Sequence, residues 1–233
     1  MSAPEFSVII LTSAPPGLSA DAGGAFVKVD GRECLLRSVE LFLNRGNVKQ
    51  LLLVVAADRM EDAKSRYGAH LGFSGVKLVA GGPRWIDQII AAGSKVSPDS
   101  SHIILHDAAR PAVPFSDIDA LLESASQLDA VALAAPLRAT LVETDEGGNP
   151  LALHSPDRFQ QLFTPQVFSK ATFTKMVESK QEVHASALHL LQGSALNMRV
   201  GQSSDANLAK THLAMLPKPK KNPLTNPFEE AQW

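Results

Sequence analysis

The feature that most constrains the fold is the alternation of short apolar runs with helix-like segments over residues 6–137. Runs such as FSVIILT (6–12), VKQLLLVVAA (48–57) and SHIILHD (101–107) are rich in Val, Ile and Leu, which is typical of strands buried on both faces. A segment with helical spacing of apolar residues follows each run. This rhythm predicts parallel strands joined by crossover helices. We therefore expect an α/β fold with a Rossmann-like, mostly parallel sheet flanked by helices.

The rhythm changes after residue 137. The segment ATLVETDEGGNPLALH (139–154) reads as two short strands around a turn at 146–150, which predicts a β-hairpin arm at about 137–157. A lone hairpin is marginal in water, so we expect this arm to lean on its own domain or on a second subunit. Beyond it, VHASALHLLQ (183–192) predicts a helix, LNMRVGQ (196–202) a strand and DANLAKTHLAML (205–216) a final helix.

Length and charge limit the possible functions. The 233 residues fit a single domain over 1–216, followed by a Pro- and Lys-rich tail at 217–233 that has no periodicity. The net charge of −2 offers no basic field for nucleic acid. No apolar run reaches membrane-spanning length and the N-terminus lacks a basic signal region, so we expect no membrane contact and a cytoplasmic location.

The segment HDAARP (106–111) is the strongest candidate for a site. It ends an apolar run, and ligands of open parallel sheets bind at the carboxyl ends of strands. Asp107 could hold a ribose hydroxyl or a metal ion there. Arg110 could instead pair with it in a loop salt bridge, and the residues alone leave both hypotheses open.

Several segments together match one family in type and order. HDAARP, FTPQVF (163–168), GGAFVKVDGRECLLRSVELF (23–42) and AGG (80–82) resemble methylerythritol phosphate cytidylyltransferases, of the sugar-nucleotidyltransferase-like superfamily. The resemblance covers residues 6–216. It implies an enzyme of isoprenoid synthesis that joins CTP to methylerythritol phosphate, a sugar-alcohol phosphate, and releases pyrophosphate with the help of Mg²⁺. It also implies that the arm forms a homodimer.

The resemblance assigns roles to individual residues. In the implied reaction, a phosphate oxygen attacks the α-phosphorus of CTP, so positive charge and N–H donors must surround the phosphates. Lys28, Arg84 and Arg158 would supply catalytic charge, each from a position displaced relative to the family's basic residue. The nucleotide would contact Thr12, Ser13, Ala14, Gly81, Gly82, Gln88, Asp107 and Ala108. The substrate would contact Thr140, Thr164 and Lys210, and Asp107 would hold the metal.

The sequence also departs from the family pattern. The first loop, LTSAPPGLSADAGG (11–24), lacks the family's Leu-Ala-Ala-Gly-x-Gly-x-Arg form, and Pro15 and Pro16 remove N–H donors. The family's loop arginine falls near Leu18 or Ser19. Gln88 replaces a serine that contacts cytosine, and the lysine of a late Asn-Ile-Lys motif falls on Asn207 or Lys210.

These departures leave three hypotheses. Loss of one preorganised donor typically lowers a rate by about 10²–10³. The first hypothesis is therefore a divergent homologue with lost or weakened activity. The second is an active nucleotidyltransferase that uses the shifted basic residues or another substrate. The third is a non-catalytic, dimeric interaction protein.

Overall fold

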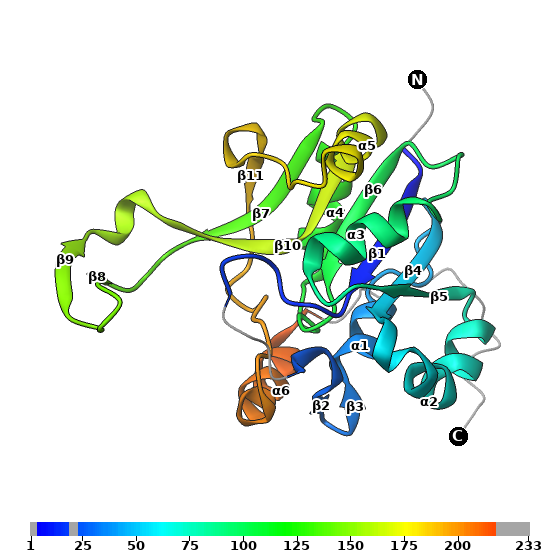
Figure 1. Ribbon diagram of the computed structural model, residues 1–233, viewed down its shortest axis with the longest axis horizontal. Coiled ribbons are helices and arrows are strands. Elements are labelled where there is room, and N and C mark those ends of the chain that lie inside the picture. Colours follow the sequence, from blue (N-terminus) through cyan, green and yellow to red (C-terminus); the bar gives the residue numbers. More distant parts are fainter. Residues whose placement is uncertain (1–3, 19–22, 218–233) are drawn as a thin grey trace.

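The computed structural model describes residues 4–18 and 23–217, which include a seven-stranded sheet in the order β11-β7-β10-β6-β1-β4-β5 (Figure 1). Its strands are β1 (Phe6–Leu11), β4 (Val48–Ala56), β5 (Val76–Gly81), β6 (His102–Asp107), β7 (Ala130–Pro136), β10 (Gln160–Ser169) and β11 (His189–Gln192). β1 pairs in parallel with β4 and β6, whereas β10 runs antiparallel to β6 and β7. The predicted α/β class and mostly parallel sheet are confirmed.

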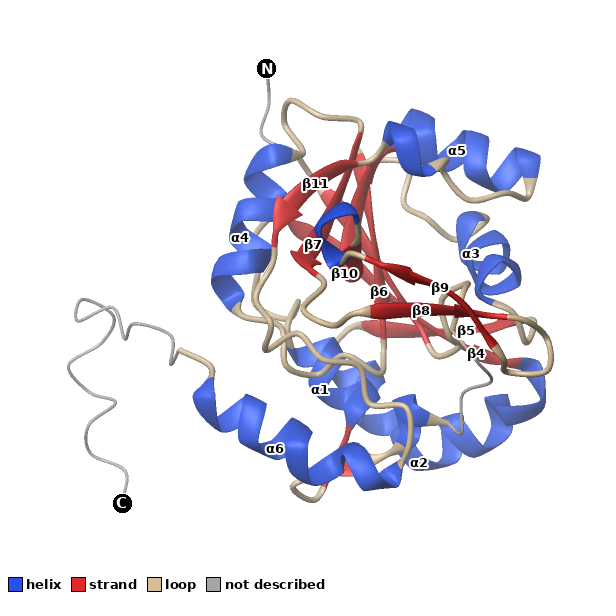
Figure 2. Ribbon diagram, turned by 90° about the vertical axis from the view of Figure 1, so that its left-hand side faces the viewer, coloured by secondary structure: helices blue, strands red, loops and turns tan. Residues whose placement is uncertain are grey.

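Helices cover both faces of this sheet (Figure 2). They are α1 (Cys34–Glu40), α2 (Met60–Phe73), α3 (Trp85–Gly93), α4 (Phe115–Ser124), α5 (Lys170–Ser179) and α6 (Ala206–Met215). Residues of α1, α2 and α4 pack in one hydrophobic cluster, and residues of α3 and α5 pack in another. None of the helices in the described parts is long and apolar enough to cross a bilayer.

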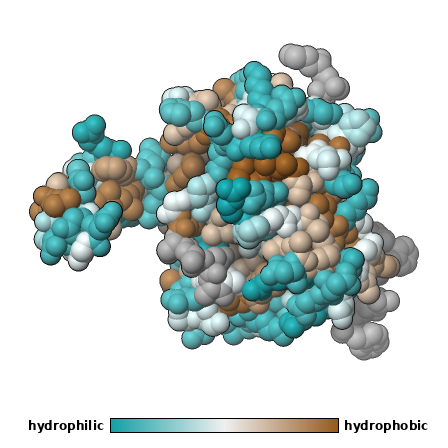
Figure 3. All heavy atoms as spheres, viewed as in Figure 1, coloured by the Kyte–Doolittle hydropathy of each residue, from teal (hydrophilic) through white to brown (hydrophobic). Residues whose placement is uncertain are grey.

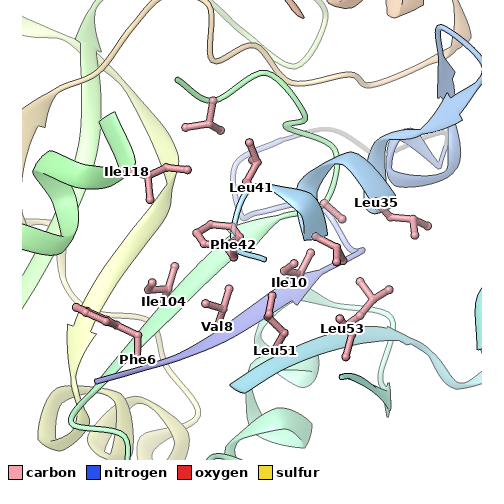
Figure 4. Packing of buried hydrophobic residues seen from close by; sticks show 14 of the residues in the cluster. Phe6, Val8, Ile10, Leu35, Leu41, Phe42, Leu51, Leu53, Ile104 and Ile118 are labelled. Carbon is pink, nitrogen blue, oxygen red and sulfur yellow. The ribbon is translucent and has the colours of Figure 1, made fainter. Parts of the chain in front are cut away.

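The two clusters follow from the alternation of side chains along each strand. Val8 and Ile10 of β1 belong to the first cluster, where they lie near Phe42 (Figure 4). Ile9 and Leu11 belong to the second cluster. Successive strand residues point to opposite faces, so a strand covered on both sides must be apolar at every position. The continuous apolar runs in the sequence therefore mark the central strands.

A small hairpin and the last helix form a third packing unit. β2 (Lys28–Val29) and β3 (Arg32–Glu33) are joined by Asp30 and Gly31, whose φ angles of 52° and 77° suit a tight hairpin turn. Val29 packs with Cys34 of α1, with Val200 of the loop before α6, and with Ala209 of α6 itself. Burial raises the pKa of the Cys34 thiol to about 12, which fits a core residue rather than a nucleophile.

The predicted hairpin arm is present. β8 (Leu141–Thr144) and β9 (Pro150–His154) pair antiparallel in a sheet of their own, and this ribbon projects away from the body (Figure 1). The side chain of Asp145 closes the turn by accepting hydrogen bonds from the backbone and side-chain nitrogens of Asn149.

Two predictions for the C-terminal part are wrong. The segment 183–192 is a short 3-10 turn (Ala185–Ala187) followed by strand β11, because pairing with β7 at the edge of the sheet outweighs the helix-like spacing of Leu188 and Leu191. The segment 196–202 forms no strand, since loop partners take its polar groups. Val200 N, for example, donates to the carbonyl of Ala109 at 2.8 Å. The predicted tail lies almost wholly outside the described residues.

Candidate functional site

A cavity of 930 Å³ opens where β1, β4 and β5 end. Its walls come from the loop after β1, the 3-10 turn after β4 (Ala57–Arg59) and the start of α3. The described lining includes Thr12, Ser13, Ala14, Arg59, Arg84 and Gln88. This is the carboxyl edge of a parallel sheet, where ligands of such folds bind.

Gln88 joins the first loop to α3 at this cavity. Its Oε1 accepts hydrogen bonds from the backbone N–H groups of Thr12 at 3.0 Å and Ser13 at 3.2 Å. Its Nε2 donates at 3.4 Å to the hydroxyl of Thr12 and to the carbonyl of Gly82. The side chain is 1% exposed. Backbone donors at the start of the loop are thus already paired with a protein side chain.

The Ala-Gly-Gly segment lets α3 approach the end of β5. A Cβ at Gly82 would lie 2.6 Å from Cβ of Asp87, and one at Gly81 would lie 2.9 Å from Cγ of Gln88. Both distances are too short for real side chains, so the two glycines are needed to seat the first turn of α3. Gly81 and Gly82 therefore allow the side chains of Gln88 and Asp87 to lie close against the end of β5.

Two arginines line the cavity and have different partners. Arg84 donates from Nε and Nη2 to both carboxylate oxygens of Asp87, at 2.8 and 2.7 Å. This contact raises the pKa of Arg84 and lowers that of Asp87. Arg59 instead lies over the ring of Phe26, with its guanidinium carbon 4.8 Å from the ring centroid.

Asp107, at the end of β6, is fully buried and engaged on both oxygens. Oδ1 accepts from the backbone N–H of Ala109 at 2.9 Å, and Oδ2 accepts from Nε of Arg199 at 2.7 Å. Nε of Arg110 is further away, at 3.9 Å. Burial raises the pKa of Asp107, and the guanidinium of Arg199 opposes that shift. The nearer partner of the acid is thus Arg199 and not the arginine of its own loop.

The HDAARP and FTPQVF segments meet around this ion pair. The backbone N–H of Asp107 donates to the hydroxyl of Thr164 at 3.0 Å, and that hydroxyl lies 3.4 Å from Nδ1 of His106. Arg110 donates to the carbonyl of Asn197 at 2.8 Å and stacks on Phe163. Burial lowers the pKa of His106 to about 3, so this histidine is neutral at physiological pH.

The surroundings of Asp107 decide whether a magnesium ion fits there. Mg²⁺ is usually held by one or two carboxylates together with waters and substrate phosphates. The carboxylate of Asp107 faces the guanidinium groups of Arg199 and Arg110 and has no exposed surface. Over residues 4–18 and 23–217, no three His, Cys, Asp or Glu side chains gather as a metal cluster. In this arrangement the residues do not fit a magnesium ion.

The remaining predicted residues lie apart from the cavity lining. Lys28 lies on β2, with its Nζ 3.7 Å from Oε1 of Glu33. Lys210 lies on α6, with its Nζ 2.7 Å from Oδ1 of Asp30. Arg158 is exposed in a 3-10 turn between β9 and β10 (Pro156–Arg158), and Thr140 is exposed just before β8 of the arm. Ala108 is buried, and its backbone N–H donates to the carbonyl of Leu11. Of the three predicted catalytic cations, Arg84 is the one in the described lining.

Sequence reasoning missed Arg59 and Arg199. Asn197-Met198-Arg199 has the Asn-apolar-basic form of the Asn-Ile-Lys motif that the family resemblance implies, and treating arginine as equivalent to lysine would have revealed Arg199. Arg59 lies just after the carboxyl end of a buried strand, β4, and Asp107 lies at the carboxyl end of another, β6. The same positional argument would have selected it.

The mostly parallel sheet and the cavity at the carboxyl ends of its strands define an α/β protein of the class that binds ligands at this edge. Within this class, the family model for 2-C-methyl-D-erythritol 4-phosphate cytidylyltransferase matches residues 8–215. The chain belongs to that family.

Relatives and solved structures agree with this assignment. The 2-C-methyl-D-erythritol 4-phosphate cytidylyltransferase of Vibrio atlanticus is 28% identical over 216 residues, which cover 84% of this chain and 90% of the relative. That of Rhodopirellula baltica is 24% identical over 227 residues, which cover 88% and 93%. A crystal structure of 4-diphosphocytidyl-2C-methyl-D-erythritol synthase matches with a TM-score of 0.72 at 20% identity, over 91% of this chain and all of that one. The crystal structure of the synthase from Anaerococcus prevotii matches with a TM-score of 0.71 at 18% identity, over 91% of this chain and 99% of that one. At these identities the solved structures support the fold.

Proposed function

We propose that this protein binds CTP in the cavity at the ends of β1, β4 and β5 and transfers its cytidylyl group to methylerythritol phosphate only weakly. Membership of the family and the position of the cavity support the nucleotide and the acceptor. The observation that carries the reduced activity is the buried contact of Asp107 with Arg199 at 2.7 Å. That contact withholds the acid at the strand end from any ligand.

The chemistry explains why such a site is slow. The attacking phosphate and the departing pyrophosphate are both anionic, so catalysis depends on donors aimed at the charge of the transition state. In the first loop, Gln88 occupies the N–H groups of Thr12 and Ser13, while Pro15 and Pro16 have none to give. Because each missing donor typically lowers the rate by about 10²–10³, the loop alone accounts for a large loss.

An active enzyme with displaced charges is the second hypothesis. It requires Lys28, Arg158 and Lys210 to join Arg84 at the cavity, through movement or from another copy of the chain. It also requires Mg²⁺, which the family resemblance implies, to displace Arg199 from Asp107. Contacts of the acceptor with Thr140 and Thr164 belong to this hypothesis as well.

The arm supports a homodimer as part of the proposal. Val142, Leu151 and Leu153 are 51%, 62% and 74% exposed on it, and Figure 3 shows hydrophobic atoms gathered along the same projection. An isolated two-stranded ribbon is only marginally stable in water. Exposed apolar side chains on such a ribbon therefore favour contact with a partner surface. The same feature would serve a non-catalytic interaction protein. The cytoplasmic location expected from the sequence stays a prediction.

A pyrophosphate-release assay with CTP, methylerythritol phosphate and Mg²⁺ tests the proposal against the Vibrio atlanticus relative. We expect turnover to be lower than the relative's by about 10² or more, in a protein that binds CTP by calorimetry. Turnover equal to the relative's would refute the weakened site and favour the displaced charges. Absence of both turnover and CTP binding would favour the interaction protein.

A further inference from the structure

We infer that Arg59 is the phosphate-binding residue of the cavity and supplies the charge that the first loop lacks. The inference rests on the proposed function, because it names the group that receives the polyphosphate of the bound nucleotide.

The position of Arg59 places it opposite the first loop. It ends the 3-10 turn that follows β4, and β4 is the neighbour of β1 in the sheet. It lines the same cavity as Ser13 and Ala14. The family resemblance implies an arginine in the first loop, and its place falls near Leu18 or Ser19 here. A guanidinium from the adjacent strand end faces the same space.

The local packing presents Arg59 with its donors available. Its guanidinium lies over Phe26 at 4.8 Å, and a Cβ built on Gly23 would lie 3.9 Å from its Nη1. Stacking uses the face of the guanidinium and leaves the N–H groups in its plane to bind an anion. Within the described residues, Arg59 makes no hydrogen bond or ion pair.

The other charged groups of the cavity leave the binding of an anionic ligand dependent on Arg59. Arg84 already forms a two-point contact with Asp87, and Asp58 and Glu182 add carboxylates to the described lining. These acids offset the positive charge, so an anionic ligand depends on the cation that a carboxylate does not neutralise. Guanidinium groups bind phosphate through two parallel hydrogen bonds, a geometry that fits the polyphosphate of a nucleotide.

The test is calorimetric titration of CTP and of sodium tripolyphosphate into the wild-type chain and three variants. Arg59→Ala removes the proposed ligand, and Arg59→Lys keeps a charge but not the two-point geometry. Arg66→Ala is the matched control, because Arg66 lies on α2, pairs with Asp62 and is outside the cavity lining. Melting curves of all four proteins report whether each variant is folded.

We expect Arg59→Ala to weaken the binding of both ligands about tenfold or more, and Arg59→Lys to weaken it less. Arg66→Ala should bind like the wild type. Unchanged CTP binding in a folded Arg59→Ala protein would overturn the inference and leave the proposed function standing. Arg59-dependent binding of tripolyphosphate without binding of CTP would keep the inference and refute the nucleotide. A wild-type chain that binds neither ligand would refute both.

Discussion

Replacing Gln88 with alanine tests how the first loop is held. The change removes the hydrogen bonds to Thr12 N at 3.0 Å and Ser13 N at 3.2 Å. Each such bond contributes about 1 kcal/mol net, and the lost methylene adds about 0.8 kcal/mol. The two contacts at 3.4 Å are long and add little. We therefore expect Gln88→Ala to lower the free energy of unfolding by about 2–3 kcal/mol.

The assay is urea unfolding followed by circular dichroism, with Gln50→Ala as the matched control. Gln50 also accepts two hydrogen bonds, from Ser7 Oγ and Ser97 N at 2.8 Å each, but it lies outside the cavity lining. Both variants should lose stability to a similar degree. Only Gln88→Ala should alter CTP affinity, and it should raise it by about twofold to tenfold, because two N–H donors become available to the ligand.

Two results would refute this role of Gln88. A loss below about 0.5 kcal/mol for Gln88→Ala would mean that the contacts do not hold the loop. Equal effects of Gln88→Ala and Gln50→Ala on CTP affinity would mean that the donors freed at Thr12 and Ser13 do not face the nucleotide.

Three further predictions concern the buried acid, the buried histidine and the arm. Arg199→Met leaves Asp107 buried with Arg110 at 3.9 Å and should destabilise the protein by about 3 kcal/mol in urea unfolding, whereas no change would refute the pairing. Because burial lowers the pKa of His106 to about 3, the unfolded chain binds the proton first as pH falls below about 6.5. Stability should fall by about 2 kcal/mol between pH 7.5 and 5, and His106→Asn should show a smaller fall. Leu153→Glu, on the exposed arm, should weaken the proposed dimer in sedimentation velocity without changing the melting temperature, and an unchanged sedimentation coefficient would contradict this role of the arm.

The sequence predicts those parts of the fold that depend on local pattern. The apolar runs mark central strands because both faces of the sheet are covered, and Asp30-Gly31 marks a hairpin because both residues adopt positive φ. Strand β11 was missed because Leu188 and Leu191 have the spacing of a helix face. Pairing with β7 at the sheet edge decided its conformation, and a local pattern does not report such pairing.

The site was less predictable because its contacts join distant segments. Arg199 reaches Asp107 across 92 positions of sequence, and Gln88 reaches Thr12 across 76. Contacts between residues so far apart leave no periodic pattern in the sequence. The motif HDAARP does lie at the carboxyl end of a strand, β6, but the chain alone left open whether its acid faced a ligand or an internal partner. In the structure that acid meets an arginine from a segment that was expected to be a strand.

Calorimetric titration of CTP with and without Mg²⁺ shows whether Asp107 serves a metal ion or an internal ion pair with Arg199. Because Arg199 already neutralises Asp107, we predict saturable CTP binding whose affinity is the same in both conditions and survives Asp107→Asn. Binding that requires Mg²⁺ and disappears in Asp107→Asn would contradict the account. It would mean that the strand-end acid leaves Arg199 to hold a metal, as in a fully active enzyme.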